Sequence, residues 1–558
     1  MNNQPKNEGG NWGSSIFFIA NLLNFVLATA VFTIPFPMHE VGIILGTTIL
    51  AITCFISVVA CTFIIEALAL KNSLVKRENI ILNKAIKANE LDKKENDKEN
   101  EDKDKDRPTF LSKESLSLSL EAKKDNKNDN DNNNDHNNDN DNSNNIEEEK
   151  ISDEKKGLLG IENENILDEK NDSFYIAKRF EISKLSKALS KPGYFFVVIT
   201  IICYLYVGVT SNGIIAGNNL KDIIGKTFDT ELPDYSYYII VSCFFIITIT
   251  IALNNIKHLK KFSMFIMVMR FVIIFLIMGC CFYSIAKYGI AKFSDIPKFD
   301  ISNITVMIGN SLFVFMSHHS IPGMVENFTP QRRLVKLLIV GYIFSLLFIV
   351  LYSYVGLFAF SNPTFSCDKN APFPIAIQST FSSNFLGLSV VGYIINYYPV
   401  LNVITSGMQL ITLRNNILEA IAGCDPAFAS SLNFAEKKGC SALLKNFLFN
   451  TVVALPPIAI GLMLQNIQSL MKYFSSILGF LIMLIVPVIV VGRYRWFFNK
   501  RDYTFGNLNQ AFIKGFWGYI IISILALGIF SMIIYGFIKN IPAKTCVNEN
   551  VTFFAFLS

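Results

Sequence analysis

The sequence predicts an all-α membrane protein, and three observations lead to this fold class. The chain has 558 residues, of which 51% are hydrophobic and 13% aromatic. Its mean hydropathy of +0.37 is too high for a soluble protein of this size. The apolar residues gather in runs of about 20 residues, which is the length that a helix needs to cross a bilayer. We therefore expect a multi-pass integral membrane protein with lipid as a partner and no nucleic-acid partner.

About eleven runs are long enough to span the membrane, in two groups at 15–70 and 191–538. In chain order, their expected limits are 15–37, 42–70, 193–217, 236–255, 262–286, 303–325, 335–360, 384–412, 447–466, 469–492 and 513–537. Basic residues concentrate in alternate loops, which places the N-terminal tail at 1–14 in the cytoplasm. An odd number of spans then puts the C-terminal tail at 539–558 on the lumenal or extracellular side.

A long polar insertion at 71–190 separates the two groups of spans, and the expected topology places it in the cytoplasm. Its centre, Asp125–Asn145, is a low-complexity run of Asn and Asp that cannot bury a core, so we predict that this Asn-, Asp- and Lys-rich insertion is disordered. The segment Phe174–Lys191 mixes apolar and basic residues. It fits either an amphipathic helix on the inner leaflet or a solvated linker.

The first span has an unusual centre for a membrane helix. Asn21 and Asn24 lie one turn apart on an apolar face, the small residues at 28–30 follow, and Pro35 and Pro37 end the segment. A bilayer has no water to bond loose backbone groups, so a broken helix survives only where it lines a cavity or a ligand. We predict that this helix breaks near residues 28–30.

The sixth span is interrupted in a similar way. Ser317, His318, His319 and Ser320 break an apolar run, and Pro322 with the following Gly loosens the chain further. We predict that this helix also breaks partway. Histidine titrates near physiological pH, which suits proton coupling. The alternative for each His is a structural hydrogen bond to a neighbouring carbonyl.

Two broken spans five apart are typical of inverted-repeat transporters, in which each repeat of five helices opens on a broken helix. Free amides and half-helix ends bind a carboxylate there, while carbonyls and small polar groups face cations. A substrate with an amine and a carboxylate fits this chemistry. The predicted substrate-binding residues are Asn21, Asn24, Ala28, Thr29, Ala30, Phe315, Met316 and Ser317. The amides at 28–30 would take the carboxylate, and residues 315–317 would face the amine and the side chain.

Two sequence strings resemble the amino acid/auxin permease family. NLLNFVLATAVFTIPFPMHEVG is similar to its first-helix signature, N-x-x-N-x-x-x-G-x-G-x-x-x-x-P followed by a Gly. Asn21, Asn24 and Gly42 match, and Ala28 and Ala30 replace the two family glycines. FVFMSHHSIPGMVENFTPQRR resembles the sixth helix of the family and is closest to its vacuolar branch. The best matching positions there are Phe313, His318 and Pro322.

The resemblance implies an eleven-span inverted-repeat fold of the leucine-transporter type, with broken helices 1 and 6. It also implies amino acid transport coupled to H⁺ or Na⁺, with no other cofactor. In sodium-coupled relatives an Asn of the first helix and a Thr of the eighth help to hold the ion. Asn24 matches the Asn, and Thr405 is the candidate Thr by its distance from Arg414. An ordinary helical threonine is the alternative for Thr405, and no metal beyond Na⁺ is expected. His318 is the third candidate for ion coupling.

We therefore predict a secondary-active amino acid transporter that works by alternating access in a vacuolar, lysosome-like or plasma membrane, and not an enzyme. A channel or receptor without a transport cycle is the first alternative. The second is a membrane-embedded lipid enzyme that uses His318 and His319, although no acidic cluster accompanies them.

Two of the charged residues within the predicted spans, Glu66 and Arg270, need an explanation, because ionisable groups are costly there and usually functional. Glu66 is at the inner end of the second span, where it reaches the interface or meets Lys71. Arg270 lies inside the fifth span and needs a partner or a water-filled cavity. A gating pair and a side chain that reaches toward the interface are the alternatives for Arg270.

Overall fold

The computed structural model describes residues 12–103, 176, 180–253, 256–318, 320–325, 328, 333–361, 377–388, 390–432, 440–500 and 516–539. Every regular element in these residues is a helix, which confirms the predicted all-α class. The chain divides into two compact units. One comprises Met1–Ser73 with Ser173–Ser558, and the other comprises Leu74–Asp172.

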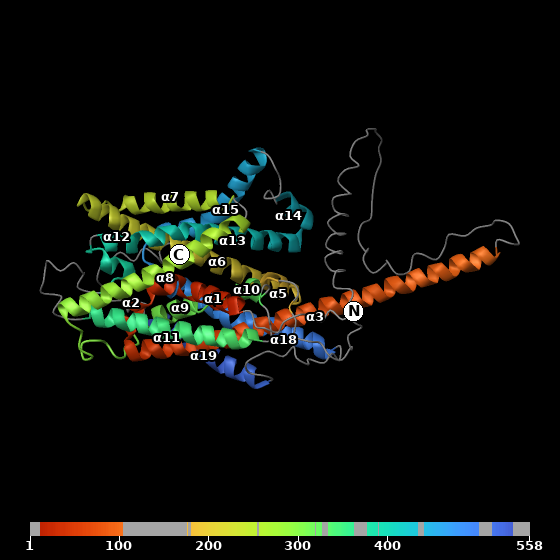
Figure 1. Cartoon of the computed structure of the whole chain (residues 1–558), viewed down its shortest axis with the longest axis horizontal. Helices are drawn as coiled ribbons and strands as arrows, with labels where there is room; N and C mark the ends of the chain where they lie inside the picture. Colours follow the sequence, from red (N-terminus) through yellow and green to blue (C-terminus); the bar gives the residue numbers. More distant parts are fainter. Residues whose placement is uncertain are drawn as a thin grey trace. The chain divides into compact units, whose positions relative to one another are not determined.

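Figure 1 labels most of the α-helices. The N-terminal half contains α1 (Trp12–Thr33), α2 (Pro35–Val41), α3 (Ile43–Lys103), α5 (Ile182–Ser186), α6 (Lys191–Phe228), α7 (Tyr235–Ile251) and α8 (Ile256–Tyr288). Next come α9 (Ile304–Val314), α10 (Ile321–Val325), α11 (Leu334–Phe360), the 3₁₀ turn η4 (Phe381–Phe385), α12 (Val390–Tyr397), the 3₁₀ turn η5 (Tyr398–Leu401) and α13 (Asn402–Cys424). The C-terminal part contains α14 (Pro426–Leu432), α15 (Cys440–Met463), α16 (Ile467–Leu470), α17 (Ser476–Phe480), α18 (Val486–Lys500) and α19 (Phe516–Lys539). Two π-helical segments, η6 (Met471–Ser475) and η7 (Leu481–Ile485), interrupt this last group.

Membrane-spanning helices are abundant, as predicted. Among the described residues, seven helices are long and apolar enough to cross a bilayer, and the bent pair formed by α1 and α2 makes an eighth candidate. The other predicted spans coincide with shorter or interrupted helices, namely α7, α9 with α10, and α12 with η5 and α13. The total of eleven therefore stays a prediction. The eighth predicted span also differs in its limits, because α13 continues to Cys424 rather than ending at 412.

The helices of the larger unit form a bundle with two main groups of contacts. In one group, α6, α7, α13 and α15 all pack against each other. In the other, α1 packs against α9 and α11, and α9 also packs against η6, α17 and α19. Figure 1 shows α7, α13 and α15 along one side of this bundle and α11 and α19 along the other. Apolar side chains stay exposed on the outer faces, as lipid contact requires. Examples are Phe344, Leu347 and Leu351 of α11 and Leu448 and Val452 of α15.

The limits of the predicted disordered insertion need a correction. Helix α3 runs on through Lys103, so residues 71–103 are helical. This stretch is rich in Lys and Glu, which favour helix, and it contains no Pro or Gly to interrupt one. The low-complexity centre at Asp125–Asn145 lies outside the described residues, as does the C-terminal tail from 540 onward. At the N-terminus, α1 begins at Trp12, so residues 12–14 are helical rather than part of the tail.

The described part of Phe174–Lys191, residues 176 and 180–191, differs from both interpretations, and the rest of the segment lies outside the described residues. Its helix α5 is five residues long, and Ile182 and Leu185 are buried rather than facing lipid. Two side chains of α18 fix this segment: Tyr494 Oη donates to Leu185 O at 3.1 Å, and Arg493 Nε donates to Ala188 O at 2.9 Å. The segment is thus part of the larger unit.

Gly42 separates α2 from α3 and has a backbone conformation that other residues rarely adopt. Its φ is +88°, and an added Cβ would lie 2.4 Å from the carbonyl carbon of Lys298. The close approach lets the 297–300 loop bond the start of α3, since Ile43 N donates to Pro297 O at 2.9 Å. Glycine is required here for both reasons.

Candidate functional site

The first span is broken at Ile34, not at 28–30 as predicted. Residues 28–30 are helical, and α1 continues to Thr33 before the chain bends by 59° into α2. Small residues alone do not remove backbone hydrogen bonds, whereas proline does, because it has no N–H. Pro35 and Pro37 therefore place the break one to two turns later than the small residues suggest.

The two prolines release two specific carbonyls. In a regular helix, the N–H of residue i bonds the carbonyl of residue i−4, so Pro35 and Pro37 leave Val31 O and Thr33 O without helical donors. Both oxygens have side-chain donors from other segments. Tyr352 Oη of α11 donates to Val31 O at 3.1 Å, and Gln468 Nε2 of α16 lies 3.3 Å from Thr33 O. The break is thus stabilised from outside, as a low-dielectric environment demands.

The sixth span breaks where the sequence predicts. Helix α9 ends at Val314, residues 315–318 and 320 are not helical, and α10 begins at Ile321. Both described helices of this pair are short, and α9 is buried along its whole length. His318 is fully buried at the break, while His319 lies outside the described residues.

Hydroxyl groups from α3 and α11 surround the non-helical backbone of this second break. Ser57 Oγ lies 2.6 Å and Tyr342 Oη 3.1 Å from Phe315 O. Tyr342 Oη also lies 2.6 Å from Ser317 Oγ and 3.3 Å from Cys61 Sγ. All five residues are buried, and we call them the Tyr342 cluster. Its contacts hold the non-helical turn against the second and seventh spans.

The structure brings the two broken segments together, because α1 and α2 both pack against α9. Of the predicted substrate-binding residues, Ala30, Phe315, Met316 and Ser317 are buried. Asn21 and Asn24 are half-buried on α1. The side chains of Ala28 and Thr29 lie outside the described residues.

Asn24 has a partner that the sequence did not reveal. Arg270 Nη1 of α8 donates to Asn24 Oδ1 at 2.5 Å and to Asn24 O at 2.6 Å. Arg270 Nε donates to Tyr398 Oη at 2.9 Å. Arg270 is 4% exposed, so it does not extend to the interface as one interpretation had it. It links α1, α8 and η5 instead, which corresponds to the alternative of a partnered residue.

Thr405 shows no hydrogen bond to Asn24 in the described part of the chain. It is half-buried on α13, whose packing partners are α6, α7, α8, α14, α15 and η5. The oxygens of Asn24 are engaged by Arg270. The sodium site proposed at Asn24 and Thr405 therefore stays a prediction. The guanidinium of Arg270 contacts Asn24.

An ion pair with a buried carboxylate lies at the predicted inner end of the second span. Arg495 of α18 bonds Glu66 of α3 through two parallel contacts, Nε to Oε1 at 2.6 Å and Nη2 to Oε2 at 2.8 Å. The Glu66 side chain is fully buried. The predicted partners, the interface or Lys71, are thus wrong. Such a bidentate pair fixes the relative position of two helices more strictly than a single contact does.

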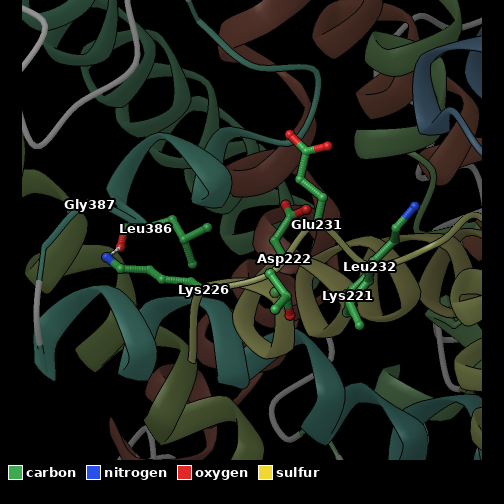
Figure 2. Close-up of a pocket in the computed structure, with 9 residues that line it drawn as sticks. Lys221, Asp222, Lys226, Glu231, Leu232, Leu386 and Gly387 are labelled. Atoms are coloured by element: carbon green, nitrogen blue, oxygen red, sulfur yellow. Dashed lines mark hydrogen bonds between the residues drawn. The ribbon is translucent and has the colours of Figure 1, made fainter. Parts of the chain in front are cut away.

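A pocket of about 560 Å³ lies at the end of α6 and is open to solvent. Figure 2 shows that charged side chains of both signs line it, including Asp222 and Glu231 beside Lys221 and Lys226. Asp222 accepts a hydrogen bond from Ser383 Oγ at 3.1 Å. None of its described lining residues belongs to α1, α2, α9 or α10. The predicted site residues are therefore not gathered in this pocket.

Sequence reasoning found the broken segments but missed the side chains that complete them. These are Tyr342 and Tyr352 of α11, Gln468 of α16 and Ser57 of α3. Each is a single polar residue within a span or at its end, which is the available signal. Nothing in the local pattern indicates which carbonyl each residue reaches, since the partners lie up to 435 residues away in the chain.

Comparison with known proteins adds independent evidence. A family described as "Transmembrane amino acid transporter protein" matches residues 168–541, a region that excludes α1 and α2. The relatives include a transmembrane protein 104 homolog from Dictyostelium discoideum, 24% identical over 500 residues, which cover 87% of this chain and 89% of that protein. A Drosophila melanogaster homolog is 25% identical over 197 residues, 35% of this chain and 36% of that protein. Human transmembrane protein 104 is 22% identical over 201 residues, again 35% and 36%.

Proposed function

The chain belongs to the transmembrane amino acid transporter family, and from this premise we propose that it is a secondary-active amino acid transporter that works by alternating access. The family match covers most of the chain and supports a transporter rather than an enzyme. The observation that carries the mechanism is the pair of broken helices in mutual contact, α1 with α2 and α9 with α10. Broken helices at a common site are how many secondary transporters expose backbone groups to small charged substrates.

An arrangement of two inverted repeats of five helices accounts for the supporting side chains. The first and sixth spans would open the two repeats, and the second and seventh would follow them. Tyr352 of the seventh span bonds the break in the first span. Ser57 of the second span and Tyr342 of the seventh span bond the break in the sixth span. Each break thus rests on helices that an inverted repeat places beside it.

The substrate carboxylate would bind beside residues 28–30, near Arg270. Asn24 and Ala28 lie one turn apart on α1, so the guanidinium that contacts Asn24 offers a positive charge close to that turn. Because residues 28–30 are helical, their amides become available only if the junction at Ile34 opens further. The amine and the side chain would face residues 315–317 at the second break.

Arg270 favours H⁺ over Na⁺ as the coupling ion. A sodium ion bound by Asn24 Oδ1 would lie about 4 Å from the guanidinium, where two unit charges repel by roughly 4 kcal/mol at an effective dielectric constant of 20. The oxygens that would bind sodium already accept hydrogen bonds from a cation. His318, buried at the second break, is the candidate residue for proton coupling.

Uptake into proteoliposomes tests this proposal. Purified protein is supplied with single radiolabelled amino acids while a pH gradient or a sodium gradient is imposed separately, with empty liposomes as the control. We expect a pH gradient to drive accumulation and a sodium gradient at constant pH to have no effect. Accumulation driven by sodium alone would overturn the assignment of the coupling ion.

Counterflow separates the transporter from the channel alternative. Vesicles preloaded with an unlabelled substrate should accumulate the labelled amino acid transiently, because an alternating-access carrier exchanges substrate across the membrane. A channel gives no such overshoot, and its absence with every amino acid would contradict the proposed function. The host membrane, vacuolar, lysosome-like or plasma, is a separate question that fluorescence of the tagged protein answers.

A further inference from the structure

Arg414 lies inside the group formed by α6, α7, α13 and α15, and it is only 6% exposed. Its bonded neighbours are two asparagines of α15. Nη1 donates to Asn446 Oδ1 at 3.1 Å and lies 3.5 Å from Asn450 Oδ1. Both asparagines are buried, Asn450 completely. Among the described residues, a charged side chain is therefore held between helices by neutral partners.

The charge of Arg414 is not balanced by a carboxylate in the described part of the chain. A guanidinium stays protonated in proteins, and buried charges are normally paired. Glu419, one turn further along α13, is paired instead with Lys187. Arg495, by contrast, forms an ion pair with Glu66. Among the described residues, Arg414 shares with Arg270 the combination of a buried guanidinium and neutral partners, but the bonded partners of Arg414 are asparagine side chains alone.

Two buried donors beside this charge also have no acceptor among the described residues. They are Nε of Arg414 and Nδ2 of Asn450. The Asn450 amide is oriented by Arg414, because its Oδ1 faces Nη1 and its Nδ2 must then point elsewhere. A buried donor without an acceptor costs free energy. Here one such donor belongs to the guanidinium and the other to the neighbouring asparagine, so one ligand can satisfy both. An anion would accept from both and neutralise the guanidinium.

The position of these residues separates them from the proposed transport site. Arg414 follows Thr405 by nine residues, which places the two about 180° apart around α13. Asn446 lies six residues from the start of α15, or about 9 Å along the helix axis, so the group sits toward one end of the helix. The lipid-facing residues of α15, such as Leu448 and Val452, are exposed on the other side. A lipid phosphate would have to pass between packed helices to reach Arg414.

We propose that Arg414 and Asn450 bind a small inorganic anion, chloride in the cell, between α13 and α15. The guanidinium supplies the charge, Nε–H and Nδ2–H supply the two hydrogen bonds, and Asn446 holds the guanidinium in place. The predicted topology puts the nearer end of α15 in the cytoplasm, which is the side from which the ion would enter. The ion would join two helices of the group formed by α6, α7, α13 and α15.

Thermal unfolding of the purified full-length protein in nanodiscs tests this site without any transport measurement. The melting temperature is followed as sodium gluconate is replaced by sodium chloride or sodium bromide at constant ionic strength. A ligand that binds only the folded protein raises stability as the logarithm of its concentration. We expect a saturable rise with chloride and bromide in the wild type.

Three variants complete the experiment. Arg414→Gln and Asn450→Leu should abolish the chloride-dependent rise, whereas Lys445→Gln should keep it. Lys445 is an exposed cation beside Asn446, so its variant controls for the loss of one positive charge. If Arg414→Gln does not fold, bromide titration of the wild type and Asn450→Leu still decides the question. Equal melting temperatures of the wild type in gluconate and chloride would overturn the proposal, as would an unchanged chloride effect in Asn450→Leu.

Discussion

Replacing Tyr342 by phenylalanine tests whether the second break depends on its surrounding hydroxyls. The substitution removes one oxygen atom from the Tyr342 cluster and leaves the ring, which lies 6.2 Å from the ring of Phe315, in place. The lost contacts are those to Phe315 O at 3.1 Å, to Ser317 Oγ at 2.6 Å, to Ser57 Oγ at 2.9 Å and to Cys61 Sγ at 3.3 Å. No new volume is introduced, so the effect reports the hydrogen bonds.

The size of the effect follows from those contacts. A neutral hydrogen bond contributes about 0.5–1.5 kcal/mol net, and a buried group left without a partner costs about 1–3 kcal/mol. Ser57 Oγ still lies 2.6 Å from Phe315 O, so that carbonyl keeps a donor. Ser317 loses its closest partner. We therefore expect a loss of about 2 kcal/mol, which corresponds to roughly a 30-fold fall in uptake efficiency if the loss is specific to the transport-competent state.

Tyr354→Phe is the matched control for this measurement. Tyr354 is on the same helix, and its hydroxyl lies 2.9 Å from Thr47 of α3, the same partner helix, without touching either break. Both variants are assayed for amino acid uptake in proteoliposomes and for thermal unfolding. The reasoning predicts a large loss of uptake for Tyr342→Phe and a small one for Tyr354→Phe. Equal effects of the two variants, or uptake by Tyr342→Phe within twofold of wild type, would refute it.

Three further substitutions test other features of the fold. Gly42→Ala combines a positive φ with a Cβ only 2.4 Å from the backbone of the facing loop, so it should lower the free energy of unfolding by about 1–3 kcal/mol. Gly279→Ala, whose added Cβ has no atom within 4 Å and lies inside helix α8, should not lower the melting temperature. Glu66→Gln should destabilise by up to about 3 kcal/mol because the partly buried Arg495 loses its counter-charge, and a thermal melt in which the variant matches wild type would contradict this. Asn24→Ala should abolish uptake and leave the amount of protein in the membrane unchanged, and uptake at the wild-type rate would count against the proposed site.

The break in the sixth span could be predicted from the sequence, but that in the first span was misplaced. In the sixth span, four consecutive polar residues and Pro322 leave few alternatives for the apolar run. In the first span, the small residues at 28–30 predict a break there, but these residues are helical. The physical cause of the bend is that Pro35 and Pro37 lack backbone N–H groups. Both prolines are evident in the sequence.

Pairings between distant residues could not be predicted from a single sequence. Arg270 and Asn24 are 246 residues apart, and helix periodicity gives the face of each residue but not the helix opposite. The same holds for Glu66, whose partner is 429 residues away and not the nearby Lys71. Local patterns therefore identified polar residues in need of partners and left their partners open.

The donors on Val31 O and Thr33 O limit how the first helix can move. Both oxygens rely on side chains that belong to other segments, Tyr352 of α11 and Gln468 of α16. Any motion that draws α1 away from those segments strands two carbonyls in a medium that offers no substitute. Water, or the cargo itself, has to arrive as the helices part. Hydration of the junction is therefore part of the conformational change, and a junction without water keeps α1 in contact with α11 and α16.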